Sequence, residues 1–368
     1  MTRRLRALFS SLALVATLAH AHQDAPARMR MHFIDVGQGS ATLLEFKCGA
    51  VLIDTGAASK THPAALEGYL EKFFRLRPDL NRTLKAVYLT HCHADHAFGL
   101  ATVAKRFRVE RYLDDGIRKG SGLRFLSPFL AYAADPAHPS TVVGISDAEV
   151  RAVPDGLGLT NEDIDPLACD ECDPRLSVLA GGIDPKPTDW SKTAFENLNN
   201  HSLVIRAELG GASLLVTGDL ETHGIRRLTG HYGGTGLLDA DVLVAGHHGA
   251  ENGLSPELVR LASPAVGIIS CGRWDAGKGG TDRFTTWWYG HPNEGAVKML
   301  ARGVERARPP LNVKVGQGGR KFVDFRLDRA VYCTGWDGTV VVDAFSDGQI
   351  AVRDHGLDYR PNPPAVNR

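Results

Sequence analysis

The sequence predicts an α/β domain in which helices and strands form layers. Short apolar runs of strand type occur near the start, at 31–36, 41–46 and 50–53, and again between residues 313 and 352. Segments with helical spacing of apolar residues lie between these two groups. Strands at both ends with interleaved helices are typical of a layered α/β domain. The 368 residues suffice for one large domain with a buried core.

The remaining elements follow from Pro, Gly and capping residues that bound apolar segments. We expect helices at 62–74, 95–107, 255–262 and 293–302 and after Asp219, and strands at 85–89, 109–113, 203–209, 213–217, 241–245 and 266–270. Between about 114 and 199 the chain is rich in Gly, Pro, Asp and Ser, and its periodicity is weak. We interpret this segment as a long irregular insertion that forms a lid or rim over a site.

The N-terminus has the pattern of an export signal. Three arginines precede a short apolar run from Leu8 to Ala19, and Ala19-His20-Ala21 has the small-x-small form of a cleavage site. The run is too short for a comfortable membrane span, although an uncleaved anchor helix is the alternative. We therefore expect a signal peptide at 1–21 and a hydrolase domain at 22–368. The mature protein would be periplasmic or secreted, with no membrane attachment.

Charge and cysteine content narrow the partners and the disulfides. Lysines and arginines number 42 and acidic residues 42, so the net charge is zero and no global electrostatic grip on nucleic acid is indicated. The six cysteines permit disulfides in an exported protein. Cys169 and Cys172 are the only close pair, and for them a local disulfide or free thiols are favoured over a structural zinc site.

The strongest local signal is the run T-H-C-H-A-D-H from Thr90 to His96, directly after a predicted strand. His91 and His93 point the same way on an extended segment, so both can reach one metal ion. Asp95 and His96 lie where the chain turns into a helix and can face a second ion. Alternation turns Cys92 away from the two histidines, which favours a core position over a role as a ligand.

Four further candidate residues also sit at three predicted strand ends. His201 precedes one strand, Asp219 follows another, and His247 and His248 follow a third. Each alone is commonly a surface residue, a turn or a helix cap. Their shared placement favours a common site, because sites in layered α/β folds gather along one edge of the strands.

These pieces together resemble the metallo-β-lactamase fold superfamily, and within it the hydrolase domain of ComEC-type DNA-uptake proteins and their stand-alone relatives. The matching segments, in the family's order, are F-I-D-V-G-Q-G-S-A (33–41), L-I-D-T-G (52–56), L-T-H-C-H-A-D-H (89–96), N-N-H-S-L-V-I (199–205), L-L-V-T-G-D-L-E (214–221), D-V-L-V-A-G-H-H-G (241–249), I-I-S-C-G (268–272) and Y-G-H-P (289–292). The set is specific for the fold and much less so for the substrate. The ComEC membrane channel is absent from this chain, so DNA import by this polypeptide alone is not expected.

The resemblance implies a four-layer αββα sandwich with a site for two divalent ions at one edge of the sheets. The implied ligands of one ion are His91, His93 and His201, and those of the other are Asp95, His96 and one histidine of the pair His247/His248, with Asp219 bridging both. His201 stands where relatives often have Asn, which favours a fuller ligand set here. The remaining histidine of the pair (His247, if His248 is the ligand) and His291 would face the substrate, and Asp54 would orient a ligand.

The expected chemistry is hydrolysis by a hydroxide that bridges the two ions, with Asp95 as a possible proton acceptor. Imidazole and carboxylate ligands suit zinc, with manganese and iron as alternatives. We expect a phosphodiester or another small molecule as substrate, and nucleic acid only as a substrate. The alternatives are a β-lactam or lactone hydrolase on the same fold and a binding protein that holds metal without turnover. For Trp287 and Trp288, packing is favoured over stacking on a substrate ring.

Overall fold

The computed structural model describes residues 26–56, 64–137, 139–154 and 156–353. The predicted signal peptide, 1–21, lies outside these residues. Within the described ranges, no helix is long and apolar enough to cross a membrane.

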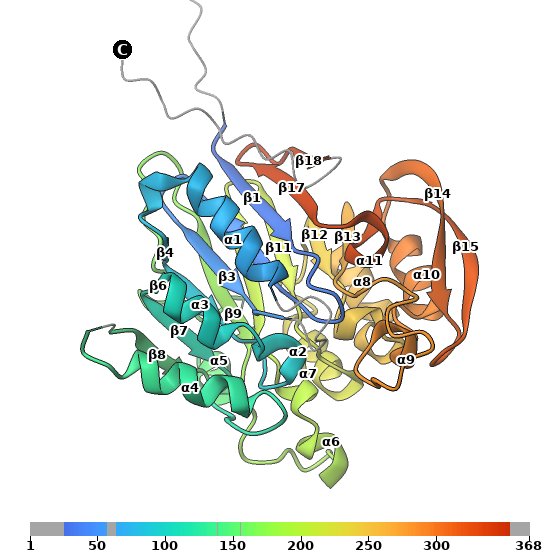
Figure 1. Ribbon diagram of the computed structural model, residues 1–368, viewed down its shortest axis with the longest axis horizontal. Coiled ribbons are helices and arrows are strands. Elements are labelled where there is room, and N and C mark those ends of the chain that lie inside the picture. The colour runs from blue at the N-terminus through green and yellow to red at the C-terminus, as the bar shows by residue number, and fades with distance from the viewer. Residues whose placement is uncertain (1–25, 57–63, 138, 155, 354–368) are drawn as a thin grey trace, which may run out of the picture.

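Two large sheets form the centre of the molecule (Figure 1). The first has eight strands in the order β18 (Ile350–Arg353), β17 (Val340–Phe345), β1 (Arg28–Phe33), β2 (Thr42–Glu45), β3 (Ala50–Ile53), β5 (Ala86–Tyr88), β7 (Arg111–Asp114) and β8 (Thr141–Gly144). The second has six strands in the order β16 (Val331–Cys333), β13 (Val266–Ile269), β12 (Val242–Val244), β11 (Ala212–Val216), β10 (Val204–Leu209) and β9 (Arg175–Ala180). The hairpin β14 (Ala307–Gly316) and β15 (Phe322–Arg329) and the pair β4 (Thr83–Leu84) and β6 (Arg108–Val109) stand apart.

The alternation of apolar residues along the strands explains the layers. In β3, Val51 and Ile53 belong to the core shared by the two sheets, whereas Leu52 belongs to a second core on the outer face. Three helices cover that outer face: α1 (Ala65–Leu76), α3 (Leu100–Arg106) and α4 (Leu123–Ala133). The other long helices, α7 (Thr222–Tyr232), α8 (Pro256–Ala262) and α10 (Glu294–Gly303), pack with the second sheet. The result is the expected αββα sandwich.

Short helical turns complete the chain and occur mainly at strand ends and in connections. They are α2 (Ala94–Ala97), α5 (Asp147–Arg151), α6 (Lys192–Glu196), α9 (Thr286–Tyr289), α11 (Thr334–Asp337), η1 (Pro78–Leu80), η2 (Leu198–His201), η3 (His247–Gly249) and η4 (Glu251–Gly253). The helix expected at 95–107 is two helices, α2 and α3. They separate at Gly99, whose N–H donates to the carbonyl of Thr55, and a side chain at Gly99 would collide with that carbonyl.

The segment expected to be an irregular insertion, 114–199, is only partly irregular. It contributes α4, β8, α5, β9 and α6, whereas the described residues of 152–174 and of 181–191 form no helix or strand. Strand β9 pairs with β10 and turns its apolar residues to the shared core. This strand was not predicted from the sequence, because the residues around it are polar. This segment therefore supplies strands to both sheets.

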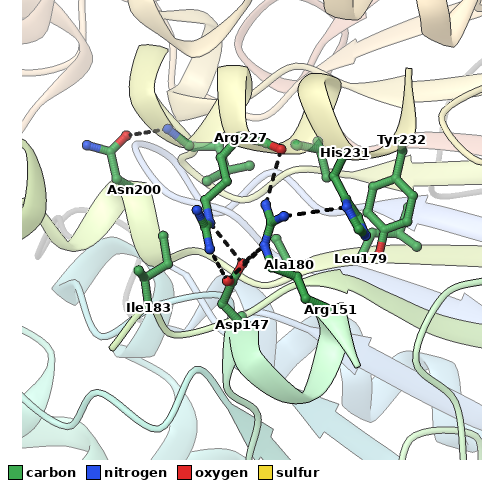
Figure 2. A pocket seen from close by; sticks show the side chains of 13 residues that line it. Asp147, Arg151, Leu179, Ala180, Ile183, Asn200, Arg227, His231 and Tyr232 are labelled. Atoms are coloured by element: carbon green, nitrogen blue, oxygen red, sulfur yellow. Dashed lines mark hydrogen bonds and ion pairs between the residues drawn. The ribbon is translucent and has the colours of Figure 1, made fainter. Parts of the chain in front are cut away.

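Two contacts fasten the segment to the sandwich. Cys169 forms a disulfide with Cys48, 121 positions away, so the local Cys169–Cys172 bond considered above is not the one formed. Asp147 of α5 accepts hydrogen bonds from Arg151 and from Arg227 of α7, beside a cavity between these helices and β9 (Figure 2). Arg227 of α7 donates to Asp147, and Arg151 of α5 donates to the carbonyl of Arg227, so α5 is held against α7.

Candidate metal centre

The strand directions bring the expected site residues to one edge of the sandwich. Strands β3 and β5 run parallel in the first sheet, and β11, β12 and β13 run parallel in the second. Their carboxyl ends continue into Asp54, the run from Thr90 to His96, Asp219, the His247–His248 turn and Ser270. Each of these segments leaves its strand at the same edge, which is why residues remote in sequence meet.

Two overlapping groups of imidazoles and carboxylates lie at this edge. His91, His96 and Asp219 form one, and Asp95, His96 and His248 form the other, with the potential ligand atoms in each group within 4.8 Å of one another. Nε2 of His96 lies 3.2 Å from a carboxylate oxygen of Asp219. Nε2 of His248 lies 3.3 Å from Asp95 and 3.4 Å from Asp219. Asp219 thus lies between the groups.

The histidine pair after β12 divides between the cluster and its rim. His247 and His248 both have left-handed backbone conformations, with φ of 50° and 54°. His248 is buried, and its Nδ1 lies 2.8 Å from the carbonyl oxygen of Ser270, which aims Nε2 at the carboxylates. His247 is partly exposed and lies near Asn252 and Glu221 instead. Of the two, His248 is therefore the one placed to hold an ion.

Asp54 holds His96 in position. Its carboxylate lies 2.7 Å from Nδ1 of His96 and accepts hydrogen bonds from the backbone N–H and the hydroxyl of Thr90, at 2.8 and 3.0 Å. The Asp54 backbone is left-handed, with a φ of 60°, and the side chain is fully buried. A carboxylate on Nδ1 places the proton there, which leaves Nε2 of His96 free to face the cluster.

His91 and His93 lie side by side as expected, but the segment between them is bent and not extended, because the backbone N–H of His93 donates to the carbonyl of His91 at 3.0 Å. Nε2 of His91 lies 2.9 Å from Nδ1 of His93, and the ring centroids are 4.6 Å apart. His91 also lies 4.0 Å from Asp219. Cys92 turns away and packs in the outer apolar core, where burial raises the pKa of its thiol to about 12. A thiol that stays protonated in the core is not available as a ligand.

His201 is not brought to the cluster, which corrects the expected ligand set. The backbone N–H of Ile183 donates to its Nδ1 at 3.1 Å, and its Nε2 lies 2.6 Å from the carbonyl oxygen of Phe195. Both ring nitrogens therefore serve the connection before β10. Asn200 accepts a hydrogen bond from the N–H of Gly224, which anchors this turn to α7 (Figure 2). The next residue, Ser202, reaches the site instead: its hydroxyl lies 3.4 Å from Nδ1 of His91 and accepts from the N–H of Asp219.

His291 lies at the rim, with its ring centroid 5.6 Å from that of His247 and 6.1 Å from that of His248. The amide of Gln38 lies 3.3 Å from Nδ1 of His291, while the amide oxygen of Gln38 accepts from Thr286. The Gln38 nitrogen therefore donates to Nδ1, which places the ring proton on Nε2. Burial, together with the nearby His248 and His247, lowers the pKa of His291 to about 3, so the ring is a neutral hydrogen-bond donor.

Gln38, Ser202 and Ser270 are the contacts that the sequence reasoning missed. Gln38 lies in the quoted G-Q-G segment, and Ser202 follows His201 at the same strand end. Their positions beside recognised motifs were a usable signal. The sequence could not predict which groups they contact, because those groups come from other segments of the chain.

The buried carboxylates of the cluster are ionised, which suits a cation. Burial disfavours the charged form of His96, but Asp219 and Asp54 outweigh this and raise its pKa well above the ordinary value. Burial acts against ionised Asp219 as well, but His248 and His96 hold its pKa well below the usual range. Asp95 is likewise ionised, because His248 and His96 outweigh the effect of burial on its pKa.

Two buried nitrogens test whether a metal fits. Within the described residues, Nε2 of His96 and Nε2 of His248 have no hydrogen-bond partner, although carboxylate oxygens lie close to both. Buried polar atoms without partners are uncommon in native proteins. Imidazole nitrogens facing carboxylate oxygens are the donor set that zinc and related divalent ions take in proteins. The residues present therefore fit a metal.

Comparisons with known proteins agree with the fold. The chain is 37% identical over 134 residues to competence protein ComA of Neisseria gonorrhoeae, which covers 35% of this chain and 17% of ComA. It is 26% identical over 283 residues to ComE operon protein 3 of Bacillus subtilis (strain 168), which covers 73% of this chain and 30% of the relative. The chain thus spans less than a third of the length of these relatives.

The chain also matches a solved structure and a sequence family. The metallo-beta-lactamase fold protein YhfI from Bacillus subtilis matches with 14% identity and a TM-score of 0.38, covering 66% of this chain and 85% of that one. The sequence description of the metallo-beta-lactamase superfamily matches residues 34–273, which include the run from His91 to His96, Asp219 and His248. The chain belongs to the metallo-beta-lactamase superfamily.

Proposed function

We propose that this protein is an exported, metal-dependent hydrolase that cleaves phosphodiesters. The observation that carries the proposal is the approach of two buried ring nitrogens to ionised carboxylates: Nε2 of His96 lies 3.2 Å from Asp219 and Nε2 of His248 lies 3.3 Å from Asp95, in both cases without hydrogen-bond geometry. Buried polar atoms without hydrogen bonds are uncommon in native proteins. A divalent ion between the rings and the carboxylates would satisfy both.

The ligand groups are unequal because His201 lies elsewhere. Asp95, His96, His248 and Asp219 would hold one ion, and His91, His93 and Asp219 would hold the second, with one protein ligand fewer. The favoured ion is zinc. When bound, two such ions supply a water molecule of lowered pKa and neutralise charge that develops on an attacked oxygen.

The chain's own residues have separate tasks. Asp54 fixes the tautomer of His96, and the Ser270 carbonyl does the same for His248. Asp95, partly exposed and ionised, can accept a proton from the attacking water. Neutral His291 offers its Nε2–H to a substrate oxygen, and partly exposed His247 stands on the same side. Donors at the rim favour a substrate whose oxygens carry negative charge, such as a phosphodiester.

Export is supported by two independent observations. The N-terminal pattern at 1–21 is that of a signal peptide, and the Cys48–Cys169 disulfide is of a kind that persists in oxidising compartments. Both observations support a periplasmic or secreted location.

One experiment tests the function. The mature chain, loaded with zinc or manganese, is assayed with bis(p-nitrophenyl) phosphate and with a chromogenic cephalosporin, each with and without chelator. We expect chelator-sensitive hydrolysis of the phosphodiester only. Cephalosporin hydrolysis would instead identify a β-lactamase, and bound metal without turnover of either compound would identify a binding protein. Asp219→Ala should lower both the metal content and the rate; unchanged values for both would contradict the assignment.

A further inference from the structure

A surface of cations and aromatic rings borders the site beyond His291. It consists of the connection after β13, residues 272–290, and the turn between β14 and β15. These two segments are joined directly, since the backbone N–H of Arg320 donates to the carbonyl of Trp287 at 2.7 Å. In Figure 1 both lie together, with α9 beside the lower end of the β14–β15 hairpin.

The half-buried rings of this surface pack on one another, as expected for Trp287. The Trp287 and Phe322 rings stack at 5.7 Å with an interplanar angle of 16°, and Trp274 lies 6.1 Å from Trp287. Two other rings remain open to solvent: Phe284 is 59% exposed and Tyr289 is 39% exposed. The packed rings thus form a base, and the exposed rings stand at its edge.

Three exposed cations lie over the tryptophans. Nζ of Lys278 is 5.1 Å from the Trp274 ring and 5.2 Å from the Trp287 ring. The guanidinium groups of Arg320 and Arg283 lie 4.6 and 5.4 Å from the Trp288 ring. Cation–π contact orients these side chains without neutralising their charge.

The acidic side chains of this surface bond to groups other than these three cations. Asp275 pairs with Arg273 at 3.1 Å, and Asp324 pairs with Lys314 at 3.0 Å. Asp282, next to Arg283, caps the backbone N–H of Phe284. Across the described chain, no carboxylate lies within ion-pair distance of Lys278, Arg283 or Arg320. Their positive charge is therefore available to an outside partner.

The surface is continuous with the metal centre. The Tyr289 ring stacks on the His291 ring at 5.5 Å with an interplanar angle of 17°. A chain whose phosphodiester reaches His291 therefore has its next group beside Tyr289, which directly follows Trp287 and Trp288, the rings beneath the cations. We call Lys278, Arg283, Arg320, Phe284 and Tyr289 together the cationic rim.

We propose that the cationic rim binds single-stranded nucleic acid next to the phosphodiester that is cleaved, an inference that rests on the proposed function. Cations that track phosphates, interleaved with exposed rings that stack on bases, are the features of single-strand binding surfaces. A small diester or a β-lactam is too short to reach both His291 and these cations. Paired bases in a duplex cannot stack on Phe284 and Tyr289.

Binding can be tested separately from catalysis. Fluorescence anisotropy of a labelled oligothymidylate of about 16 nucleotides, with phosphorothioate linkages that resist hydrolysis, is measured with the full metal-loaded chain so that no cleavage intervenes. The variant Lys278→Gln/Arg283→Gln/Arg320→Gln should bind on the order of tenfold or more weakly at low salt. Its plot of log affinity against log salt should be shallower by about 2, because each lost phosphate contact in a single strand contributes about 0.7.

A matched control removes the same charge elsewhere. Lys105→Gln/Arg175→Gln/Arg302→Gln changes three exposed cations outside the rim and should bind as the parent does. Hydrolysis of bis(p-nitrophenyl) phosphate by the metal-loaded enzyme should be the same in both variants, which also shows that each is folded. Equal weakening in both variants, or no weakening in the rim variant, would overturn the proposal. Absence of phosphodiesterase activity in the parent would instead sink the proposed function, and the binding result would stand apart from it.

A ring variant distinguishes single strands from duplexes. Phe284→Leu removes an exposed ring without disturbing the core and should weaken oligothymidylate binding by about fivefold or more, as loss of one stacked base predicts. A duplex of the same length should bind more weakly than the single strand and be insensitive to this change. Equal binding of the two, with Phe284→Leu neutral, would refute recognition of a single strand.

Discussion

Replacement of Asp54 by Asn tests whether a buried carboxylate sets the tautomer of a ligand. Asn is nearly the same size as Asp and tolerates the left-handed backbone at this position. One carboxylate oxygen accepts from the N–H of Thr90 at 2.8 Å, and the other lies 2.7 Å from Nδ1 of His96. An amide offers one oxygen and one NH₂ group, so it cannot accept at both places.

Either orientation of the new amide has a cost. If its oxygen keeps the Thr90 bond, its NH₂ faces Nδ1 of His96 and moves the ring proton to Nε2, which can then no longer bind metal. If it is reversed, two N–H donors meet at Thr90, and a buried unpaired donor costs about 1–3 kcal/mol. Loss of such a supporting contact lowers metal affinity by about 10- to 100-fold, or about 1.4–2.7 kcal/mol.

Calorimetric titration with zinc measures that affinity directly. Asp343→Asn is the control, because Asp343 is also fully buried and charged but pairs with Arg30 and Arg353 at the far strands β1, β17 and β18. It should lower the free energy of unfolding and leave zinc affinity unchanged. Parental affinity in Asp54→Asn, or an equal loss in Asp343→Asn, would refute the role assigned to Asp54.

Three other outcomes follow from the site and its frame. His201→Asn should leave the number of bound zinc ions unchanged in elemental analysis, since both ring nitrogens bond to backbone; a loss equal to that of Asp219→Ala would place His201 among the ligands. Asp219 and Asp54 raise the pKa of His96 despite its burial, so an ion must displace a proton there and zinc affinity should rise with pH. Calorimetry in buffers of different ionisation enthalpy should detect the released proton, and a pH-independent zinc affinity would contradict this. Cys48→Ser should lower the free energy of unfolding by up to about 5 kcal/mol from chain entropy, and reductant should destabilise the parent but not the variant; equal denaturation curves for both proteins without reductant would show that the bond does not form.

The strand-end motifs carried most of what the sequence could predict. The run from Thr90 to His96 follows a strand and holds four potential ligands in seven residues, so His91 and His93 were predictable as neighbours. The bend between them, in which the N–H of His93 donates to the carbonyl of His91, was not predicted. Asp219 and His248 were predictable as neighbours because parallel strands end at one edge. Short-range chemistry and strand direction were enough for these residues.

His201 shows where this reasoning fails. A histidine beside a strand end satisfies the pattern, but its direction depends on whether the preceding residues form a 3₁₀ turn, as Leu198–His201 does. That turn is held by Asn200 and by the backbone of residues 183 and 195, which belong to the weakly periodic segment. Strand β9 was missed for the same reason, because its pairing with β10 is a long-range fact that local composition does not record.

The origin of the ligands has a mechanical consequence for the sandwich. Asp95 and His96 extend from β5 of the first sheet, whereas Asp219 and His248 extend from β11 and β12 of the second. An ion held by all four would join the two sheets at the edge where these strands end. It would act as a second cross-link beside the disulfide that Cys48, in the turn after β2, forms with Cys169. Zinc supply would then set the cohesion of the whole molecule as well as its chemistry, so a metal-poor environment would yield a looser protein that proteases remove before it can act.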